Sequence, residues 1–296
     1  MKNRRIHILS LHFAVFFIFG LMACAPKAIP PPPKPANIAV VLGAGAVKGF
    51  AHIGVLKILE SQKIPIHMVV GTSVGSLVGS LYAYGYDAYN LQMIAYALER
   101  DDLIDITLPD NGFVKGEKLE NYVNRMVKGT PIEKFRIPFH AVATNIQTGE
   151  EMVFGTGNAG MAVRASCSIP GIFKPARISG KTYADGGIVS PLAIDVARRY
   201  GADVVIAVDI STGPVATIPQ GTIETILQSV DIMYAKIAAL QIPRADVVIK
   251  PSVSHIGSTD FTRKHEAILE GEKAALAAMP AIQAILSRLR QEGRLP

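Results

Sequence analysis

One serine in this sequence has the surroundings of an enzyme nucleophile. Ser73 lies between Gly71 and Gly75, after an apolar run over residues 64–70 and before a helix-forming run over residues 76–83. The two runs predict a buried strand followed by a helix. A serine at such a strand-to-helix turn is typical of a nucleophile elbow, which lifts the hydroxyl off the end of a sheet. Backbone N–H groups at the start of the helix favour a developing negative charge, so the pattern predicts acyl transfer through Ser73.

A glycine-rich loop is the second feature that fits this chemistry. Residues 43–49 read Gly-Ala-Gly-Ala-Val-Lys-Gly and follow a continuous apolar run over residues 38–42. Because ligand sites in open α/β sheets lie at the carboxyl ends of the strands, we expect this loop beside the elbow. Its N–H groups, with a lysine charge nearby, would stabilise an oxyanion. The residues predicted to form this oxyanion hole are Gly43, Ala44, Gly45, Ala46 and Lys48.

Nucleotide binding is the alternative for this loop. Its spacing is G-x-G-x-x-x-G, which matches neither the dinucleotide fingerprint nor the P-loop. The next predicted strand also ends in the elbow and not in a ribose-binding acid. Acyl transfer is therefore the better interpretation.

A serine nucleophile needs a base, and the sequence offers several candidates. Asp185 stands at the end of a predicted short strand and is followed by Gly186 and Gly187. Asp209, at the end of a stronger strand pattern, is a rival. His255 and His265 fit a Ser–Asp–His order. His52, His67 and His140 fall inside predicted helices or strands, where structural roles are expected.

These motifs together resemble the patatin-like phospholipase family, and in particular a bacterial lipoprotein-type member. The resemblance covers residues 38 to about 209 and rests on four ordered blocks, at residues 43–56, 71–75, 164–175 and 185–187. It implies a three-layer α/β/α fold with a mainly parallel sheet, and a Ser–Asp dyad without histidine. Ser73 would then be the nucleophile, Asp185 the base and the glycine-rich loop the oxyanion hole. The implied substrate is a phospholipid or another acyl-ester lipid, with no cofactor and no metal.

The glycine-rich loop departs from the family pattern at two kinds of position. Many members have Gly-Gly-Gly-x-Arg-Gly where this chain has Ala-Gly-Ala-Val-Lys-Gly over residues 44–49. Alanine keeps the N–H donor, so we expect the hole to survive if both alanines have negative φ. Lysine keeps the charge but loses the planar fork of arginine, which should weaken the anchoring of the loop. A second function class therefore stays open: a catalytically weak lipid-binding or envelope-assembly protein on the same fold.

The first 23 residues have the features of an export signal. Three basic residues precede an apolar segment over residues 6–22 that is short for a transmembrane span. Residues 21–24, Leu-Met-Ala-Cys, resemble a bacterial lipobox, so residues 1–23 are expected to be a lipoprotein signal peptide and Cys24 the lipidated N-terminus. An uncleaved anchor or a plain secretory signal is the alternative. No aspartate follows Cys24, which favours the periplasmic side of an outer membrane.

The rest of the chain is expected to comprise a tether and one domain. Residues 24–37 are rich in proline and predict an extended tether, and residues 38–296 are the predicted hydrolase domain. The formal net charge of +6 includes three basic and no acidic residues in the signal segment, so +3 remains after its removal. Such a weak, scattered charge does not imply nucleic-acid binding. Cys24 and Cys167 are the only cysteines, so a lipidated Cys24 leaves no disulfide.

The order of the predicted elements indicates an α/β fold, because strands alternate with helices. Strands are predicted over residues 38–42, 64–70, 138–144, 150–154, 182–184, 202–209 and 246–250. Helices are predicted from the glycine-rich loop to about residue 62, over residues 76–83, 87–100, 117–127, 162–168, 192–200 and 223–240, and from residue 261 onward with a break or kink at Pro280.

Overall fold

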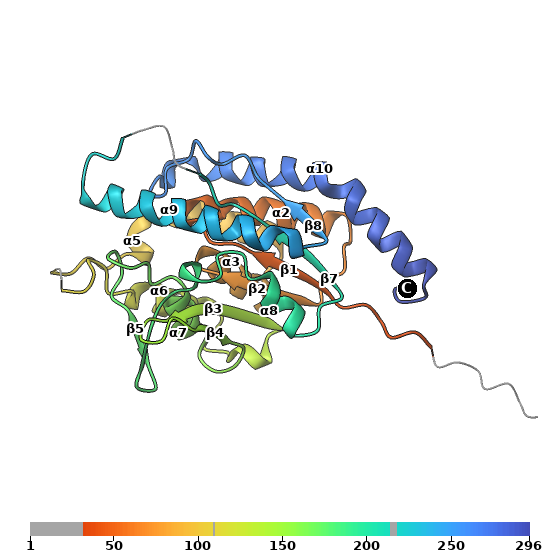
Figure 1. Ribbon diagram of the computed structural model, residues 1–296, viewed down its shortest axis with the longest axis horizontal. Coiled ribbons are helices and arrows are strands. Elements are labelled where there is room, and N and C mark those ends of the chain that lie inside the picture. The colour runs from red at the N-terminus through yellow and green to blue at the C-terminus, as the bar shows by residue number, and fades with distance from the viewer. Residues whose placement is uncertain (1–31, 109, 214–217) are drawn as a thin grey trace, which may run out of the picture. The chain divides into compact units, whose positions relative to one another are not determined.

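A computed structural model describes residues 32–108, 110–213 and 218–296. Residues 35–296 form one compact unit (Figure 1), which contains the whole sheet and its own hydrophobic core, as an independently folding domain does. The predicted signal peptide, Cys24 and most of the predicted tether lie outside the described residues. Within the described ranges, no helix is both long enough and apolar enough to cross a membrane.

A mixed sheet forms the centre of this unit, with the strand order β5-β6-β3-β2-β1-β7-β8 and β4 paired to β3. Its parallel strands are β1 (Ile38–Leu42), β2 (Met68–Thr72), β3 (Phe139–Asn145), β7 (Val204–Val208) and β8 (Val247–Ile249). The antiparallel strands are β4 (Glu151–Phe154), β5 (Ala176–Ile178) and β6 (Lys181–Asp185). Strands β1, β2, β3 and β7 are buried along their whole length, which explains their continuous apolar runs.

Helices cover both faces of the sheet and give the predicted three layers. Side chains alternate along β1, so Val40 and Leu42 face one core and Val41 faces another. The first core contains residues of α2 (Phe50–Ser61), α3 (Val74–Tyr84) and α10 (Lys264–Gln291). The second contains residues of α8 (Ile194–Arg199) and the end of α9 (Thr222–Gln241). The remaining α-helices of the unit are α4 (Ala88–Ala97), α5 (Arg100–Leu103), α6 (Glu117–Met126) and α7 (Ala159–Ser166).

Helices α2 and α10 lie side by side in Figure 1, and two glycines permit their close approach. A Cβ atom on Gly54 would lie 1.9 Å from the carbonyl oxygen of Ile268, and one on Gly271 would lie 2.0 Å from that of Ala51. Helix α10 continues through Pro280 and bends along its length, so of the predicted break or kink the break does not occur.

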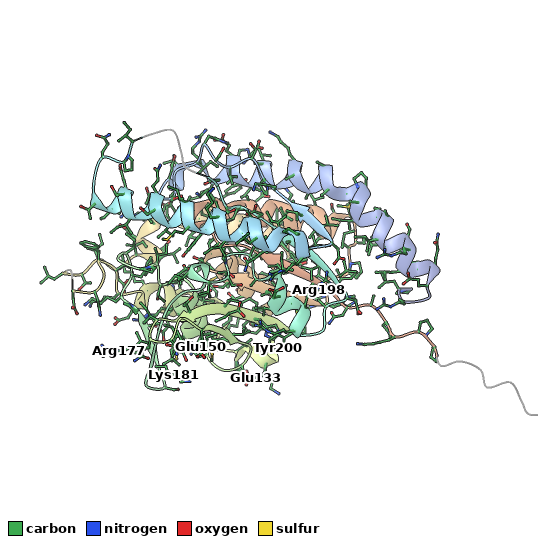
Figure 2. All side chains as sticks on the ribbon, viewed as in Figure 1. Glu133, Glu150, Arg177, Lys181, Arg198 and Tyr200 are labelled. Atoms are coloured by element: carbon green, nitrogen blue, oxygen red, sulfur yellow. The ribbon has the colours of Figure 1, made fainter. Side chains whose placement is uncertain are left out.

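The predicted elements are present, but strand β2, predicted over residues 64–70, begins only at Met68 and ends at Thr72. Three further details differ. The helix predicted over residues 87–100 divides into α4 and α5 because Leu98 adopts an extended conformation. The glycine-rich loop ends in a 3-10 turn, Ala46–Gly49, before α2 begins. Strand β5 was not predicted, and it pairs with β6 in a hairpin that carries exposed charged side chains such as Arg177 and Lys181 (Figure 2).

Candidate active site

Ser73 occupies a sharp turn between β2 and α3. It precedes the first residue of α3 and has φ 55° and ψ −127°, a positive φ that is uncommon outside glycine. Such strain is typical of functional positions. The flanking glycines are required for close backbone approach. A Cβ atom on Gly71 would lie 2.4 Å from the carbonyl oxygen of Gly75, and one on Gly75 would lie 2.0 Å from that of Leu42.

The structure brings Ser73 together with Asp185, the preferred base candidate. The Ser73 hydroxyl donates to Asp185 Oδ2 at 2.6 Å, and the other carboxylate oxygen accepts the Gly187 N–H at 2.7 Å. The two side chains are 3% and 0% exposed. A Cβ atom on Gly186 would lie 2.1 Å from the carbonyl oxygen of Val142, so a glycine here lets this turn approach β3. A proton acceptor is therefore already in place for the serine hydroxyl.

Burial changes the proton affinity of this carboxylate. Desolvation raises the pKa of Asp185 to about 6, against the opposing effects of Ser73, Gly187 and Tyr234. The Tyr234 hydroxyl is buried and lowers the pKa of Asp185, although no hydrogen bond within the usual distance and angle limits joins the two groups. An ordinary aspartate has a pKa of about 3.9 and is a weak base. At a pKa of about 6, Asp185 remains largely ionised at neutral pH but accepts a proton more readily.

Polar side chains also hold the backbone of Ser73 and of Asp185 through hydrogen bonds. Ser166 Oγ accepts the backbone N–H of Ser73 at 2.9 Å and donates to the carbonyl of Val142 at 2.6 Å. Thr144 Oγ1 donates to the carbonyl of Asp185 at 2.9 Å. No pattern in the sequence predicts a role for Thr144 or Tyr234. Ser166 has a signal, because it lies within the block of residues 164–175.

Some N–H groups of the predicted oxyanion hole already have acceptors within the protein. The N–H of Gly43 donates to Val208 at 3.1 Å, and the N–H of Ala44 donates to Pro191 at 2.9 Å. The N–H of Lys48 donates to Gly45 within the 3-10 turn at 3.2 Å. These three N–H groups are therefore already bonded to carbonyl oxygens of the protein. Among the described residues, no acceptor is bonded to the N–H groups that remain, those of Gly45 and Ala46.

The condition stated for the two alanines is met at Ala44 but not at Ala46. Ala46 has a positive φ of 50°, whereas Ala44 is not among the residues with positive φ. The positive φ brings Cβ close to the backbone, a strain that the glycine found here in many family members avoids. Ala46 nevertheless keeps an N–H group at the wall of the cavity beside Ser73.

Lys48 is predicted to belong to the oxyanion hole, and in the structure its side chain anchors the glycine-rich loop. This side chain is 1% exposed, and its ammonium group donates to Thr212 Oγ1 at 2.8 Å and pairs with Asp231 at 2.9 Å. Ser258 donates to the same carboxylate oxygen at 2.7 Å. Asp231 belongs to α9, so this ion pair joins the loop to that helix. The compact ammonium meets both acceptors from a fully buried position.

The rival bases have other partners. Asp209 accepts hydrogen bonds from Ser211 and from Lys250. His255 pairs with Glu266, and His265 contacts the Tyr96 hydroxyl. The structural roles expected for three histidines fit their surroundings: His52 bonds to the Gly43 carbonyl, His67 accepts the Ile38 N–H, and His140 stacks on Tyr200. Burial lowers the pKa of His52 and of His140 to about 4.

A largely apolar cavity of about 340 Å³ reaches Ser73. Its wall includes side chains from α2, α3, α4, α6 and α9, among them Ile53, Leu77, Leu81, Leu91, Leu119 and Leu227. Its few polar contributors include Ser258 and Thr259. A hydrocarbon chain is the ligand that suits such a wall. In the described part of the chain, no group of three His, Cys, Asp or Glu side chains is arranged to hold a metal ion.

The fold and this geometry define a class: α/β proteins with a serine on an elbow, hydrogen-bonded to a buried aspartate at an apolar cavity. The chain belongs to the patatin-like phospholipase family, whose model matches residues 40–198.

The curated relatives that this chain matches are longer than the chain itself. It is 26% identical over 292 residues to lysophospholipase NTE1 of Pyricularia oryzae, covering 88% of this chain and 19% of that protein. It is 30% identical over 275 residues to an uncharacterised NTE family protein of Mycobacterium tuberculosis, covering 83% of this chain and 47% of the relative. The chain thus spans between a fifth and a half of the length of these relatives.

Solved structures show lower similarity. VipD from Legionella pneumophila aligns with a TM-score of 0.48 and 14% identity, over 85% of this chain and 67% of that chain. The type III effector ExoU of Pseudomonas aeruginosa aligns with a TM-score of 0.47 and 12% identity, over 86% of this chain and 53% of that chain.

Proposed function

We propose that this protein is a serine acyl hydrolase that releases fatty acids from phospholipids or related lipids. The observation that carries the proposal is the 2.6 Å hydrogen bond from Ser73 to Asp185 at the wall of an apolar cavity. Membership of the patatin-like phospholipase family supports a lipid substrate. The lysophospholipase name of one relative supports an ester with a long acyl chain.

The proposed reaction begins with attack by Ser73 Oγ on the ester carbonyl carbon. Its proton passes to Asp185 Oδ2 as the new C–O bond forms, which gives a tetrahedral oxyanion. Collapse of this intermediate breaks the ester bond, and the departing alcohol takes the proton from Asp185. Water then attacks the acyl-enzyme, gives a proton to Asp185, and the acid is released as Ser73 recovers its hydrogen. The two residues act as one unit because Asp185 accepts or donates the proton in every step that makes or breaks a bond to Ser73.

The proposed oxyanion site is formed by the N–H groups of Gly45 and Ala46, with the first turn of α3 facing it. Backbone donors that are fixed before the reaction stabilise charge at little reorganisation cost. The N-terminal end of α3 adds a partial positive charge next to Ser73. Ion pairing of Lys48 with Asp231 would hold the two N–H groups in register with the nucleophile.

The proposal is tested with the unit of residues 35–296, a soluble short-chain p-nitrophenyl ester and a fluorophosphonate probe. We expect ester turnover and labelling in the parent, and loss of both in Ser73→Ala. Asp185→Asn should lose turnover by several orders of magnitude, with an unchanged circular dichroism spectrum. Ser80→Ala is the matched control, because Ser80 is a buried serine of α3, the helix that follows Ser73, and its hydroxyl donates to the carbonyl of Leu77.

Three outcomes would overturn the proposal in whole or in part. Turnover that survives in Ser73→Ala at unchanged melting temperature would remove the nucleophile assignment. A parent that binds lipid but neither hydrolyses the ester nor reacts with the probe would instead establish the lipid-binding alternative. Activity that survives in Asp185→Asn but is lost in His255→Ala or His265→Ala would favour a histidine as the base.

A further inference from the structure

Two segments far apart in the sequence form the outer wall of the apolar cavity. Ile106 and Phe113, before α6, line it from one side, and Ile223 and Leu227, at the start of α9, line it from another. The segments also share a hydrophobic cluster around Phe173. Both lie at the left end of the unit in Figure 1.

Four apolar side chains of these segments are exposed, and we call them the apolar rim: Ile106, Leu108, Ile218 and Ile223. Leu108 and Ile218 are 86% and 80% exposed, more than any other large apolar side chain that the structure describes. Ile106 is 74% exposed and Ile223 46% exposed, and these two also line the cavity. Leu108 stands two positions after Ile106, and Ile218 five positions before Ile223, so each of the two most exposed side chains is close in sequence to one that lines the cavity. Exposed apolar side chains beside an apolar cavity are typical of an interaction site.

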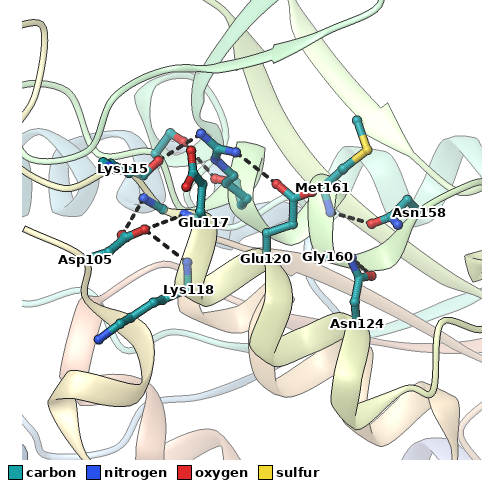
Figure 3. A network of polar contacts seen from close by, with 12 residues as sticks. Asp105, Lys115, Glu117, Lys118, Glu120, Asn124, Asn158, Gly160 and Met161 are labelled. Atoms are coloured by element: carbon teal, nitrogen blue, oxygen red, sulfur yellow. Dashed lines mark hydrogen bonds and ion pairs between the residues drawn. The ribbon is translucent and has the colours of Figure 1, made fainter.

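The segment that carries Ile106 and Leu108 is held by the polar contacts in Figure 3. Asp105 accepts the N–H groups of Gly116, Glu117 and Lys118 at 2.7, 3.0 and 3.1 Å, so it caps α6. The Thr107 N–H donates to Phe113 at 2.8 Å and closes the base of the loop. Ile106 and Leu108 are thus presented to solvent from a fixed base.

The charges near the apolar rim do not favour a partner that binds through opposite charge. Residues 100–118 contain three basic and five acidic residues. Several of these charges are already engaged: Asp110 pairs with Lys174, Asp105 caps α6 and Lys118 donates to the carbonyl of Asp101. A polyanionic surface would be repelled weakly, whereas an apolar phase would gain from burial of the rim.

We propose that the apolar rim docks the domain on the surface of a lipid bilayer, so that an acyl chain enters the cavity without crossing water. This inference rests on the proposed lipid substrate. Burial of Leu108 and Ile218 in the bilayer supplies the contact, while Ile106 and Ile223 continue it into the cavity. The docking is independent of any N-terminal lipid, because the rim belongs to residues 35–296.

The binding test uses residues 35–296 carrying Ser73→Ala, so that no product forms, with phosphatidylcholine vesicles in a flotation assay. Leu108→Glu and Ile218→Glu should each lower partitioning to vesicles by about tenfold or more, since each places a charge where an apolar side chain was buried. The effect should persist in 0.5 M salt, roughly 4 Å of Debye length. Leu240→Glu is the matched control: Leu240 is 74% exposed but lies 17 residues beyond Ile223 on α9, about 25 Å along the helix.

The activity test uses the same substitutions in the active enzyme. Hydrolysis of vesicle phospholipid should fall with binding in the two rim variants, and hydrolysis of a soluble short-chain ester should not change. Equal vesicle binding by the parent, rim variants and control would overturn the proposal, and so would an equal loss in Leu240→Glu. A parent that dimerises through the rim in light scattering, with monomeric rim variants that still bind vesicles, would also overturn it. Failure of the soluble ester reaction in the parent would count against the proposed function alone, since vesicle binding is measured without catalysis.

Discussion

Asp185 is the residue whose charge controls the proposed chemistry, and burial sets the pH at which it acts. Its carboxylate must be ionised to accept the Ser73 proton. With a pKa of about 6, kcat/KM for a soluble ester should rise from acid pH to a plateau, with a midpoint near pH 6. Stopped assays across pH 4–9 measure this limb. A midpoint near 4, that of an unperturbed aspartate, would contradict the desolvated base.

The same burial predicts a stability cost. The pKa of Asp185 is raised from 3.8 to about 6 on folding, so the native state binds more protons than the unfolded state between these pH values. The free energy of unfolding therefore falls as pH rises through this window, by up to about 3 kcal/mol for this group. Asp185→Asn has no charge to bury.

The variant Asp185→Asn should accordingly be as stable as the parent near pH 4 and more stable at pH 7. Urea denaturation at both pH values measures the difference. A stability difference that does not change with pH would show that burial of the charge is not its cause. Such a gain in stability on loss of a functional group is expected where an active site is built at the expense of the fold.

At the scale of single elements, the glycine-rich loop contains a residue with a strained backbone. Ala46 has a φ of 50° in the turn that leads to α2. Ala46→Gly should raise the free energy of unfolding by about 1 kcal/mol, because glycine adopts positive φ without a Cβ clash. The matched control is Ala44→Gly in the same loop, where φ is not positive. It should lower stability by about 1 kcal/mol through added chain entropy and lost burial. Thermal unfolding of both variants checks the pair, and equal shifts would contradict the strain.

The second prediction at this scale concerns the buried ion pair between this loop and α9. Asp231→Ala leaves the ammonium of Lys48 buried without its carboxylate, and should cost about 3 kcal/mol of stability. Turnover should fall as well, because the loop carries the proposed oxyanion donors. Asp195→Ala removes an exposed partner of Arg244 and should cost less than about 1 kcal/mol. Denaturant titrations compare the two, and equal costs would exclude a special role for the buried pair.

Helices, strands and turns that a short stretch of sequence determines were predictable. The central strands appear as continuous apolar runs because both faces of the sheet are covered, and the elbow appears as two glycines at fixed spacing from Ser73. The partnership of Ser73 and Asp185 spans 112 positions and became predictable only through the order of several motifs.

Other features depend on contacts that no local pattern encodes. Lys48 and Asp231 are 183 positions apart, and α9 carries no motif that identifies Asp231 or Tyr234. The oxyanion donors could not be separated from their neighbours because the carbonyls of Pro191 and Val208, from distant segments, occupy two of the candidates. The φ of Ala46 is likewise set by the junction between loop and helix and not by residue type.

At the scale of the whole molecule, location and catalysis should be separable. Residues 35–296 contain the proposed catalytic pair, the cavity and the apolar rim. Cys24, the proposed lipidation site, precedes this unit. We propose that a lipid on Cys24 keeps the enzyme in the bacterial envelope, with the outer membrane as the expected destination, while the rim governs access to substrate.

Cys24→Ser should abolish lipid modification, whereas Cys167→Ser should not, because Cys167 is buried inside the domain. A diacylglyceryl group with an amide-linked chain adds tens of buried CH₂ groups at about 0.8 kcal/mol each, far more than the dispersed charge of the mature chain supplies. Metabolic labelling with a clickable palmitate measures the modification, and fractionation measures the location. Cys24→Ser should remain an unlabelled precursor, while a cleavable non-lipoprotein signal should yield a soluble domain with full activity on soluble esters. Label that persists in Cys24→Ser would refute the lipobox interpretation, and loss of soluble-ester activity in the unanchored domain would refute the separation of location from catalysis.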